Sequence, residues 1–338
     1  MVLETRRIVL AKRPAHSVCS GDFALEATRL DSPREGEVLV RNLWMSVDPY
    51  MRLYLSEQSG LHSSLPIGEP LTGAAVGEVM ESRSSAFQPG SFVISQTMGW
   101  RENYVAAADT LTPLAAGTDH LQRYLGIYGL TGITAFAGIR HVLKPKPGET
   151  LLVSGAAGAV GSVALQLAKI AGARVIGTTG NDDKGRWLTE TLGADAFINY
   201  RNEDVGSRLA ELAPDGLDML FDNVGGAQLE IAIDAMQSKG RIALCGAISQ
   251  YEDANYRAGP ANLFAIIEKH ISITGFNAGF YFDRAPAIIG ELSGLIDSGK
   301  LIWEETIVEG LEKAPTAFAT MLSGGNKGKM LVKLGDLS

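Results

Sequence analysis

The sequence of 338 residues contains only two cysteines, Cys19 and Cys245, and five histidines. Two cysteines cannot build a disulfide framework or a four-cysteine zinc site. The histidines are scattered, and no two of them have the i, i+3 or i+4 spacing of a metal site on a helix. We therefore expect no metal site in this protein.

Positive charge and long apolar runs are scarce as well. The formal net charge is −8, which argues against a nucleic-acid partner or an anionic membrane surface. No apolar stretch approaches the roughly 20 residues that span a bilayer. The first 14 residues mix charged side chains with single aliphatic ones and lack the continuous apolar core of a signal peptide. We expect a cytoplasmic protein.

The chain is long enough for two domains, and the pattern of apolar residues changes along it. Up to about residue 125, short apolar runs such as 38–43, 75–80 and 91–94 are separated by Gly, Pro and polar clusters, which is typical of a β-rich domain. From about residue 126, strands alternate with helices, which predicts a doubly wound parallel α/β sheet.

The predicted strands of this α/β part are 151–154, 174–177, 196–199, 218–221 and 240–246, and the predicted helices are 159–171, 183–192, 203–213 and 226–238. The tail has two predicted strands, 305–308 and 329–334, around a helix at 315–322, and we expect it to return to the β-rich domain. The predicted domains are therefore 1–125 with 304–338, and 126–303.

The segment 151–162 carries the strongest functional signal. Three glycines, Gly155, Gly158 and Gly161, follow a short apolar strand and open a helix. Glycines in this turn let the backbone approach a pyrophosphate, and the N–H groups of the helix start bind its negative charge. The helical spacing behind the turn and a second strand at 174–177 favour a dinucleotide site over a turn without a ligand.

The end of the second strand indicates which dinucleotide is bound. NAD-binding proteins of this kind place an acidic residue there, about 20 residues after the first glycine, to bind the ribose 2′-OH. Here the segment is Gly177-Thr178-Thr179-Gly180, without an acid, and Lys184 and Arg186 follow closely. This pattern favours the 2′-phosphate of NADP.

Several longer motifs occur in one order along nearly the whole chain. They are 46–52 (SVDPYMR), 129–135 (GLTGITA), 156–162 (AAGAVGS), 221–226 (FDNVGG), 240–251 (GRIALCGAISQY) and 325–329 (GNKGK). In these motifs the chain resembles the zinc-independent medium-chain dehydrogenases/reductases, and among them the NADP-dependent alkenal/one oxidoreductases, such as the prostaglandin reductases and curcumin-reductase-like enzymes. The resemblance implies a GroES-like first domain, a Rossmann second domain and a homodimer.

The resemblance also implies a set of residues that bind NADP(H). Lys184 matches the residue that binds the 2′-phosphate, Tyr200 the aromatic residue beside the adenosine, and Asn326 a residue that reaches the cofactor from the tail. The remaining implied contacts come from Gly155, Gly158, Ala159, Val160, Gly161, Asn223, Cys245, Gly246, Ala247, Ile248, Tyr251, Phe276, Asn277 and Ala278.

Without a metal to polarise a carbonyl, the chemistry that fits best is reduction of an activated C=C bond in an α,β-unsaturated aldehyde or ketone. Hydride transfer to the β carbon moves charge to the carbonyl oxygen, so the site needs an acid that stays protonated at neutral pH. Tyr251, in a polar loop after a strand, is our candidate, and Tyr50 is a second. The segments 56–66 and 252–261 are the expected substrate loops.

Two other functions stay open from the sequence. The first is an NADPH-dependent quinone oxidoreductase of the same superfamily, and the second is an NADPH-binding protein without catalysis. A further expectation concerns assembly. The segment 271–275 has the pattern of an edge strand able to extend the sheet across a two-fold axis, which favours a homodimer.

Overall fold

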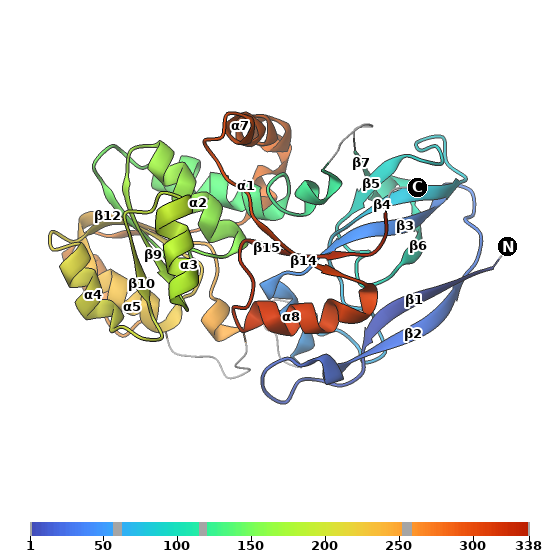
Figure 1. The fold of residues 1–338 in the computed structure, drawn as a ribbon, viewed down its shortest axis with the longest axis horizontal. Coiled ribbons are helices and arrows are strands. Elements are labelled where there is room, and N and C mark those ends of the chain that lie inside the picture. The colour runs from blue at the N-terminus through green and yellow to red at the C-terminus, as the bar shows by residue number, and fades with distance from the viewer. Residues whose placement is uncertain (1, 57–62, 115–119, 252–258, 337–338) are drawn as a thin grey trace. The chain divides into compact units, whose positions relative to one another are not determined.

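The computed structural model describes residues 2–56, 63–114, 120–251 and 259–336. The chain forms two compact units (Figure 1). Unit 1 comprises Met1–Gly126, Glu305–Asn326 and Met330–Ser338, and unit 2 comprises Ile127–Glu304 and Lys327–Lys329. No helix among the described residues is both long and apolar enough to cross a membrane.

Unit 1 is built on antiparallel strands, as its short apolar runs predicted. β1 (Leu3–Leu10) and β2 (Phe23–Leu30) pair with each other, and a seven-stranded sheet has the order β14-β15-β3-β4-β5-β7, with β6 paired to β3. The strands of this larger sheet are β3 (Glu37–Ser46), β4 (Ala75–Ser82), β5 (Phe92–Ser95), β6 (Asn103–Ala107), β7 (Thr112–Pro113), β14 (Glu305–Glu309) and β15 (Lys329–Lys333).

The tail returns to unit 1, as predicted. β15 pairs antiparallel with β3, so that Leu331 lies opposite Ser46. The helix α8 (Ala314–Leu322) adds the buried Phe318, whose ring centroid lies 5.9 Å from that of Trp100 and 6.3 Å from that of Phe23. The last part of the sequence therefore completes the core of the first unit.

Unit 2 contains the predicted parallel sheet, in the order β10-β9-β8-β11-β12-β13. Its strands are β8 (Thr150–Val153), β9 (Arg174–Thr179), β10 (Ala196–Asn199), β11 (Leu217–Asp222), β12 (Met236–Leu244) and β13 (Ser272–Gly275). Its α-helices are α1 (Leu130–Ala137), α2 (Ala159–Ile170), α3 (Asp182–Arg186), α4 (Val205–Leu212), α5 (Gly226–Ala235), α6 (Leu263–Glu268) and α7 (Ala285–Asp297). This strand order reverses between β8 and β11, which is where such sheets bind dinucleotides.

Short 3₁₀ and π turns connect these elements. They are η1 (Ser20–Asp22), η2 (Pro49–Leu55), η3 (Ala108–Thr110), η4 (Leu121–Leu125), η5 (Gly138–Leu143), η6 (Trp187–Thr191), η7 (Ile248–Gln250), η8 (Ala278–Arg284) and η9 (Leu311–Lys313).

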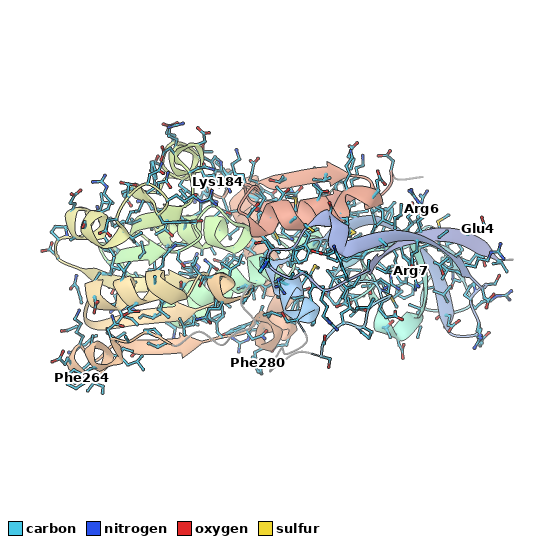
Figure 2. The ribbon with its side chains drawn as sticks, turned by 90° about the horizontal axis from the view of Figure 1, so that it is seen from below. Glu4, Arg6, Arg7, Lys184, Phe264 and Phe280 are labelled. Carbon is cyan, nitrogen blue, oxygen red and sulfur yellow. The ribbon has the colours of Figure 1, made fainter. Side chains whose placement is uncertain are left out.

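The strand β13 lies at the edge of the sheet, as predicted, and all four of its residues are exposed. Exposed apolar side chains lie nearby in the sequence, among them Phe264 on α6, at 66%, and Phe280 in η8, at 84% (Figure 2). An edge strand presents unpaired backbone groups that can pair with another chain.

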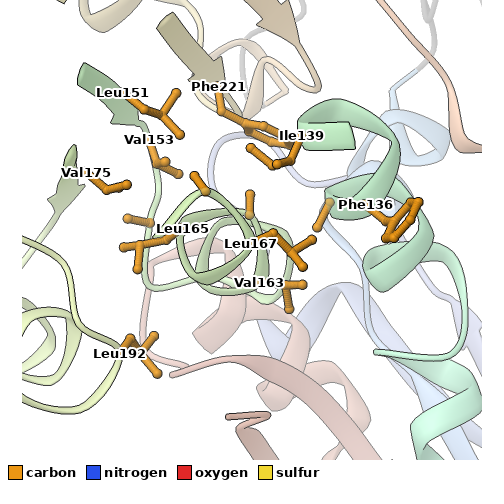
Figure 3. Close-up of a cluster of buried hydrophobic side chains, with 14 of the residues drawn as sticks. Phe136, Ile139, Leu151, Val153, Val163, Leu165, Leu167, Val175, Leu192 and Phe221 are labelled. Atoms are coloured by element: carbon orange, nitrogen blue, oxygen red, sulfur yellow. The ribbon is translucent and has the colours of Figure 1, made fainter. Parts of the chain in front are cut away.

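Both faces of the parallel sheet are buried, because successive strand residues point to opposite sides. Leu151 and Val153 of β8 pack in one cluster with α1, α2 and α7, whereas Leu152 between them packs in another with α4 and α5. Figure 3 shows the first cluster, in which Leu165 and Leu167 of α2 are fully buried. This packing holds the start of α2 beside the end of β8.

The boundaries of a predicted helix and of the strand after it were wrong, since the strand predicted at 240–246 spans Met236–Leu244. The predicted helix 226–238 ends at Ala235, and β12 already begins at Met236. Met236 has φ −67° and ψ 142° and pairs with Leu217 of β11. The helical spacing of apolar residues continues as far as Met236. The pairing of Met236 with Leu217 joins residues far apart in the sequence, and local spacing does not reveal such a contact.

Candidate functional site

The glycine turn lies between β8 and α2. Gly155 has φ 59°, a conformation that glycine adopts without strain, and its carbonyl accepts a hydrogen bond from Gly158 N at 3.1 Å. A Cβ atom on Gly161 would lie 2.4 Å from the Gly155 carbonyl oxygen and 2.8 Å from the Ala156 Cα. Only glycine therefore lets α2 begin this close to the strand. The first N–H groups of a helix have no acceptor within it, so this cradle fits a pyrophosphate.

A segment of the tail lies against the same turn. Gly328 N donates to Ala157 O at 3.0 Å, and Gly328 pairs with Gly158 in a parallel bridge. The amine of Lys327 lies 5.1 Å from the ring centroid of Trp187. Asn326, a predicted cofactor contact, precedes these residues in the chain, and the sequence interpretation had not included Gly328 itself.

A buried hydrogen-bond network joins the ends of β8 and β11. Asp222, 1% exposed, accepts from Ser154 Oγ at 2.6 Å and from Gly225 N at 3.0 Å. Asn223 N donates to Ser154 Oγ at 2.8 Å, and Asn223 Nδ2 donates to Ser154 O at 2.7 Å. The predicted cofactor residue Asn223 is therefore held to Ser154 through both its backbone and its side chain. The sequence interpretation missed Ser154 and Asp222, although Ser154 ends a predicted strand and Asp222 directly follows another.

Residues after β12 continue this edge of the sheet. Cys245 N and Gly246 N donate to Asp222 O at 2.8 and 3.1 Å, and Ile248 N donates to Asn223 O at 3.2 Å. Burial, with a smaller contribution from Asp222, raises the pKa of the Cys245 thiol to about 12. A raised pKa favours the protonated thiol of Cys245 at neutral pH over the nucleophilic thiolate.

Tyr251 folds back over this edge. Ala247 N donates to the Tyr251 hydroxyl at 3.4 Å, and a Cβ atom on Gly246 would lie 3.4 Å from the same oxygen. Burial is the main cause that raises the pKa of Tyr251 above its ordinary value. The hydroxyl therefore stays protonated at neutral pH. The hydroxyl oxygen of Tyr251 is the acceptor of this hydrogen bond, so the bond does not involve the hydroxyl hydrogen.

The residues predicted to bind the adenosine part of the cofactor lie near the end of β9. Lys184 lies on α3 (Figure 2), where its N–H donates to Asn181 Oδ1 at 2.8 Å. Tyr200 N donates to Thr179 O at 3.1 Å, which places Tyr200 beside the end of β9. Arg201, which the sequence interpretation did not include, follows directly.

Phe276, Asn277 and Ala278 follow the edge strand β13. Phe276 N donates to Leu244 O at 3.4 Å, and Asn277 Oδ1 accepts from Gly279 N at 2.8 Å. A cavity of about 470 Å³ is lined by Phe276, Asn277 and five neighbours. A second cavity, of about 520 Å³, is lined in part by Asp222 and by three of the predicted cofactor residues, Cys245, Gly246 and Ala247.

Tyr50, the second candidate acid, belongs to unit 1. It lies in η2 and packs edge-on against Tyr54, with ring centroids 6.0 Å apart. Burial is the main cause that raises the pKa of Tyr50, followed by the charge of Asp48, which accepts a hydrogen bond from Ser46 Oγ. Of the expected substrate loops 56–66 and 252–261, residues 57–62 and 252–258 lie outside the described residues.

Family models match both parts of the chain. Residues 6–114 match the N-terminal domain of oxidoreductase, and residues 159–293 match the zinc-binding dehydrogenase family. Among the described residues the donor set does not fit zinc, which needs at least three protein ligands in catalytic sites. In the part of the chain that the structure describes, no group of three His, Cys, Asp or Glu side chains could hold a metal ion.

Individual relatives are similar over most of the chain. A 2-alkenal reductase (NADP⁺-dependent) of Nicotiana tabacum is 40% identical over 88% of this chain and 87% of its own length. An NADPH-dependent curcumin reductase of Escherichia coli is 33% identical over 97% of this chain and 96% of its own. The solved structure of CurA from Vibrio vulnificus in complex with NADPH superposes with a TM-score of 0.92 at 33% identity, covering 98% of this chain and 99% of that one.

Proposed function

The chain belongs to the NADP-dependent alkenal/one oxidoreductases of the medium-chain dehydrogenase/reductase superfamily, and we propose that it reduces the C=C bond of α,β-unsaturated aldehydes and ketones with NADPH. The observation that carries the proposal is the half-buried hydroxyl of Tyr251 at the carboxyl edge of the parallel sheet, in the same unit as a glycine turn that fits a pyrophosphate. In this proposal unit 2 binds the cofactor.

The cofactor's position follows from the chain's own groups. The start of α2 would bind the pyrophosphate, because Gly161 brings its N–H groups beside the turn. Lys184 would bind the 2′-phosphate at the end of β9, and Asn223 would contact the cofactor at the end of β11. Bound NADPH would supply a hydride for the β carbon of the substrate.

Tyr251 has the chemistry that the second half of the reaction needs. Charge develops on the carbonyl oxygen when the β carbon is reduced, and a nearby hydrogen-bond donor stabilises it. A phenol with a raised pKa remains a donor at neutral pH and can deliver the proton that the α carbon gains. Tyr50 shares a raised pKa and is the alternative proton donor, from unit 1.

The loss of NADPH absorbance with a 2-alkenal, beside NADH and a simple quinone, tests this proposal. We expect NADPH-selective turnover, with the saturated carbonyl as product. Turnover of quinones without turnover of enones would instead support a quinone oxidoreductase. Tight binding of NADPH without any turnover would support a non-catalytic binding protein.

A homodimer is part of the proposal. The exposed edge strand β13 supports it, since pairing of two such strands would extend the sheet from one copy to the other. The cytoplasmic location stays a prediction, and fractionation of cells that express the full chain would check it.

A further inference from the structure

A buried amide connects helix α2 to the segment that follows α7. Gln166 lies in α2 and is 4% exposed. Its Oε1 accepts a hydrogen bond from Ile302 N at 2.7 Å, and its Nε2 donates to Ile302 O at 2.9 Å. The same Nε2 donates to Ser162 O at 2.9 Å. The pair with Ile302 therefore ties α2 to a stretch of chain that belongs to no helix or strand.

The segment 302–304 leads from this amide to the glycine turn. Glu304 O accepts a hydrogen bond from Lys329 N at 3.0 Å. A Cβ atom on Gly328 would lie 2.0 Å from the same carbonyl oxygen, so a larger residue would displace the segment or the turn. Gly328 N also donates to Ala157 O at 3.0 Å. Gly328 therefore contacts both the turn and the segment that the buried amide holds.

These contacts join three parts of unit 2 that are far apart in the sequence. They are α2, the segment 302–304 and the tail residues Lys327–Lys329, which are the only part of the tail that belongs to unit 2. The N–H groups at the start of α2 are the ones that fit a pyrophosphate. The amide in α2 and the glycine of the tail therefore act on the same turn from two directions in the sequence.

We propose that Gln166 is a positioning residue of the cofactor site, which holds the segment 302–304 so that Gly328 stays against the glycine turn. The inference rests on the proposed place of the pyrophosphate at the start of α2. Without the amide, the backbone N–H and C=O of Ile302 lose this partner, and the segment is free to move away from the turn. A turn that is less well ordered binds a pyrophosphate less tightly, because binding must then order it.

Two substitutions in the full chain test the proposal. Gln166→Leu removes the amide, and Gly328→Ala places a methyl group against Glu304 O without changing α2. Fluorescence titration gives the Kd of NADPH and of NADH, and calorimetry gives that of adenosine 2′,5′-bisphosphate, which lacks the pyrophosphate. We expect each variant to weaken NADPH and NADH alike by about 10-fold and the bisphosphate by less than about threefold. The kcat at saturating NADPH should change by less than about threefold, since no reacting group is lost.

The double variant distinguishes positioning from general destabilisation. If Gln166 acts through Gly328, the double variant binds NADPH about as weakly as either single variant, whereas independent effects would multiply to about 100-fold. Losses that multiply would therefore overturn the proposal. A Gln166→Leu protein that is less stable but binds NADPH as tightly as wild type would overturn it as well, because the amide would then serve the fold alone.

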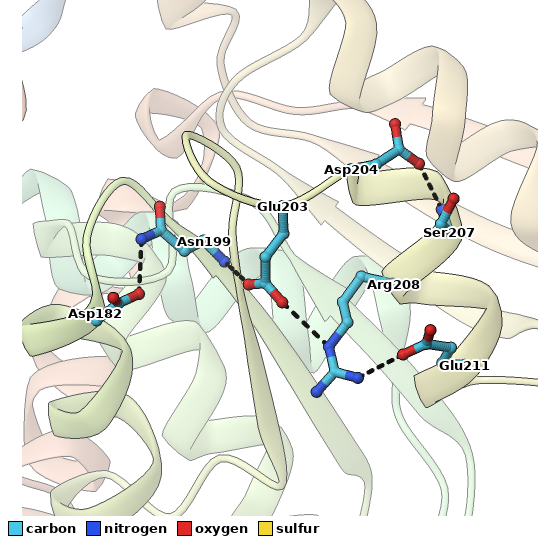
Figure 4. Close-up of polar contacts among 7 residues, drawn as sticks. All are labelled: Asp182, Asn199, Glu203, Asp204, Ser207, Arg208 and Glu211. Carbon is cyan, nitrogen blue, oxygen red and sulfur yellow. Dashed lines mark hydrogen bonds and ion pairs between the residues drawn. The ribbon is translucent and has the colours of Figure 1, made fainter.

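The matched control is Asp204→Ala, which removes the N-terminal cap of α4 elsewhere in unit 2. Asp204 Oδ1 accepts a hydrogen bond from Ser207 N at 2.8 Å (Figure 4). Its loss should lower the midpoint of denaturant unfolding and leave the Kd of NADPH within about twofold. An equal loss of NADPH affinity in this control would contradict a specific role of Gln166, because any weakening of unit 2 would then have the same effect.

The outcomes separate this inference from the proposed function. If wild type reduces enones with NADPH and Gln166→Leu binds NADPH equally well, the positioning role is overturned while the proposed function stands. If wild type reduces no enone but both variants lose NADPH affinity as expected, the proposed function fails while the positioning role stands. If the bisphosphate is weakened as much as NADPH, the effect does not lie at the pyrophosphate and the inference is overturned.

Discussion

Ser154 Oγ donates a 2.6 Å hydrogen bond to Asp222 Oδ1, and this bond joins the ends of the neighbouring strands β8 and β11. The same hydroxyl accepts from Asn223 N, and the same carboxylate accepts from Gly225 N. Two turns that we assign to the cofactor site are therefore held by one buried pair. This pair therefore organises the edge of the sheet.

Asp222→Ala should destabilise the protein by about 3 kcal/mol, because the Ser154 hydroxyl and buried backbone N–H groups lose their acceptor. Denaturant unfolding of both proteins measures the difference. The control is Asp215→Ala, an exposed aspartate in the same unit, which should change the free energy of unfolding by less than about 0.5 kcal/mol. Equal stability of the two variants would contradict the role of the network.

Tyr251→Phe should lower kcat for enone reduction about 100-fold while leaving the affinity for NADPH near that of wild type, since only the proton donor is lost. Steady-state kinetics and NADPH titration give the two quantities. Tyr50→Phe, measured in parallel, separates the two candidate acids. Full activity of Tyr251→Phe would move the role to Tyr50, to water or to a cofactor hydroxyl.

Binding of NADPH should weaken with rising pH in the alkaline range, whereas binding of NADH should not. The pKa of Lys184 is lowered in the free protein, and a bound phosphate dianion favours the protonated amine. Binding thus takes up a proton at pH values between the lowered pKa and the higher pKa of the complex. Lys184→Ala should remove this pH dependence and raise the KM for NADPH far more than it changes kcat. A parallel decline for NADH would contradict the assignment.

Gly161→Ala should abolish tight NADPH binding, because its Cβ atom would overlap the backbone of Gly155 and Ala156. The helix start must then move away from the turn. Gly294→Ala in α7 is the matched control, since nothing lies within 4 Å of its Cβ position, and it should stabilise the protein by about 0.5–1 kcal/mol. Unchanged NADPH affinity in Gly161→Ala would rule out the proposed cradle.

Ile273→Asp should shift the protein from dimer to monomer, because it places a charge on the exposed edge strand β13. Sedimentation velocity at several concentrations measures this shift. Ile302→Asp changes another exposed isoleucine of unit 2, at 39% against 37% for Ile273, and should leave the dimer intact. A wild-type protein that sediments as a monomer at every salt concentration would contradict the homodimer itself.

Local patterns were sufficient for most of the fold. The alternation of strands and helices after residue 126 predicted the parallel sheet, and the glycine spacing located the turn between β8 and α2. These features depend on residues within a few turns of one another, where chain geometry alone links pattern to structure. The end of α5 was missed because Met236 pairs with Leu217, a contact that no local period contains.

The sequence by itself determined the fold class, the glycine turn and the residue types that the site offers. Only the tertiary structure decided which of them act together. Asp222 is 68 residues from Ser154, and Arg201 reaches Gly180 only because β10 pairs with β9. Burial then changes what these groups can do, because it lowers the pKa of Lys184 and raises that of Tyr251. Which strands are neighbours, and which side chains are shielded from solvent, are properties of the folded chain. They cannot be predicted by analysing the sequence one segment at a time.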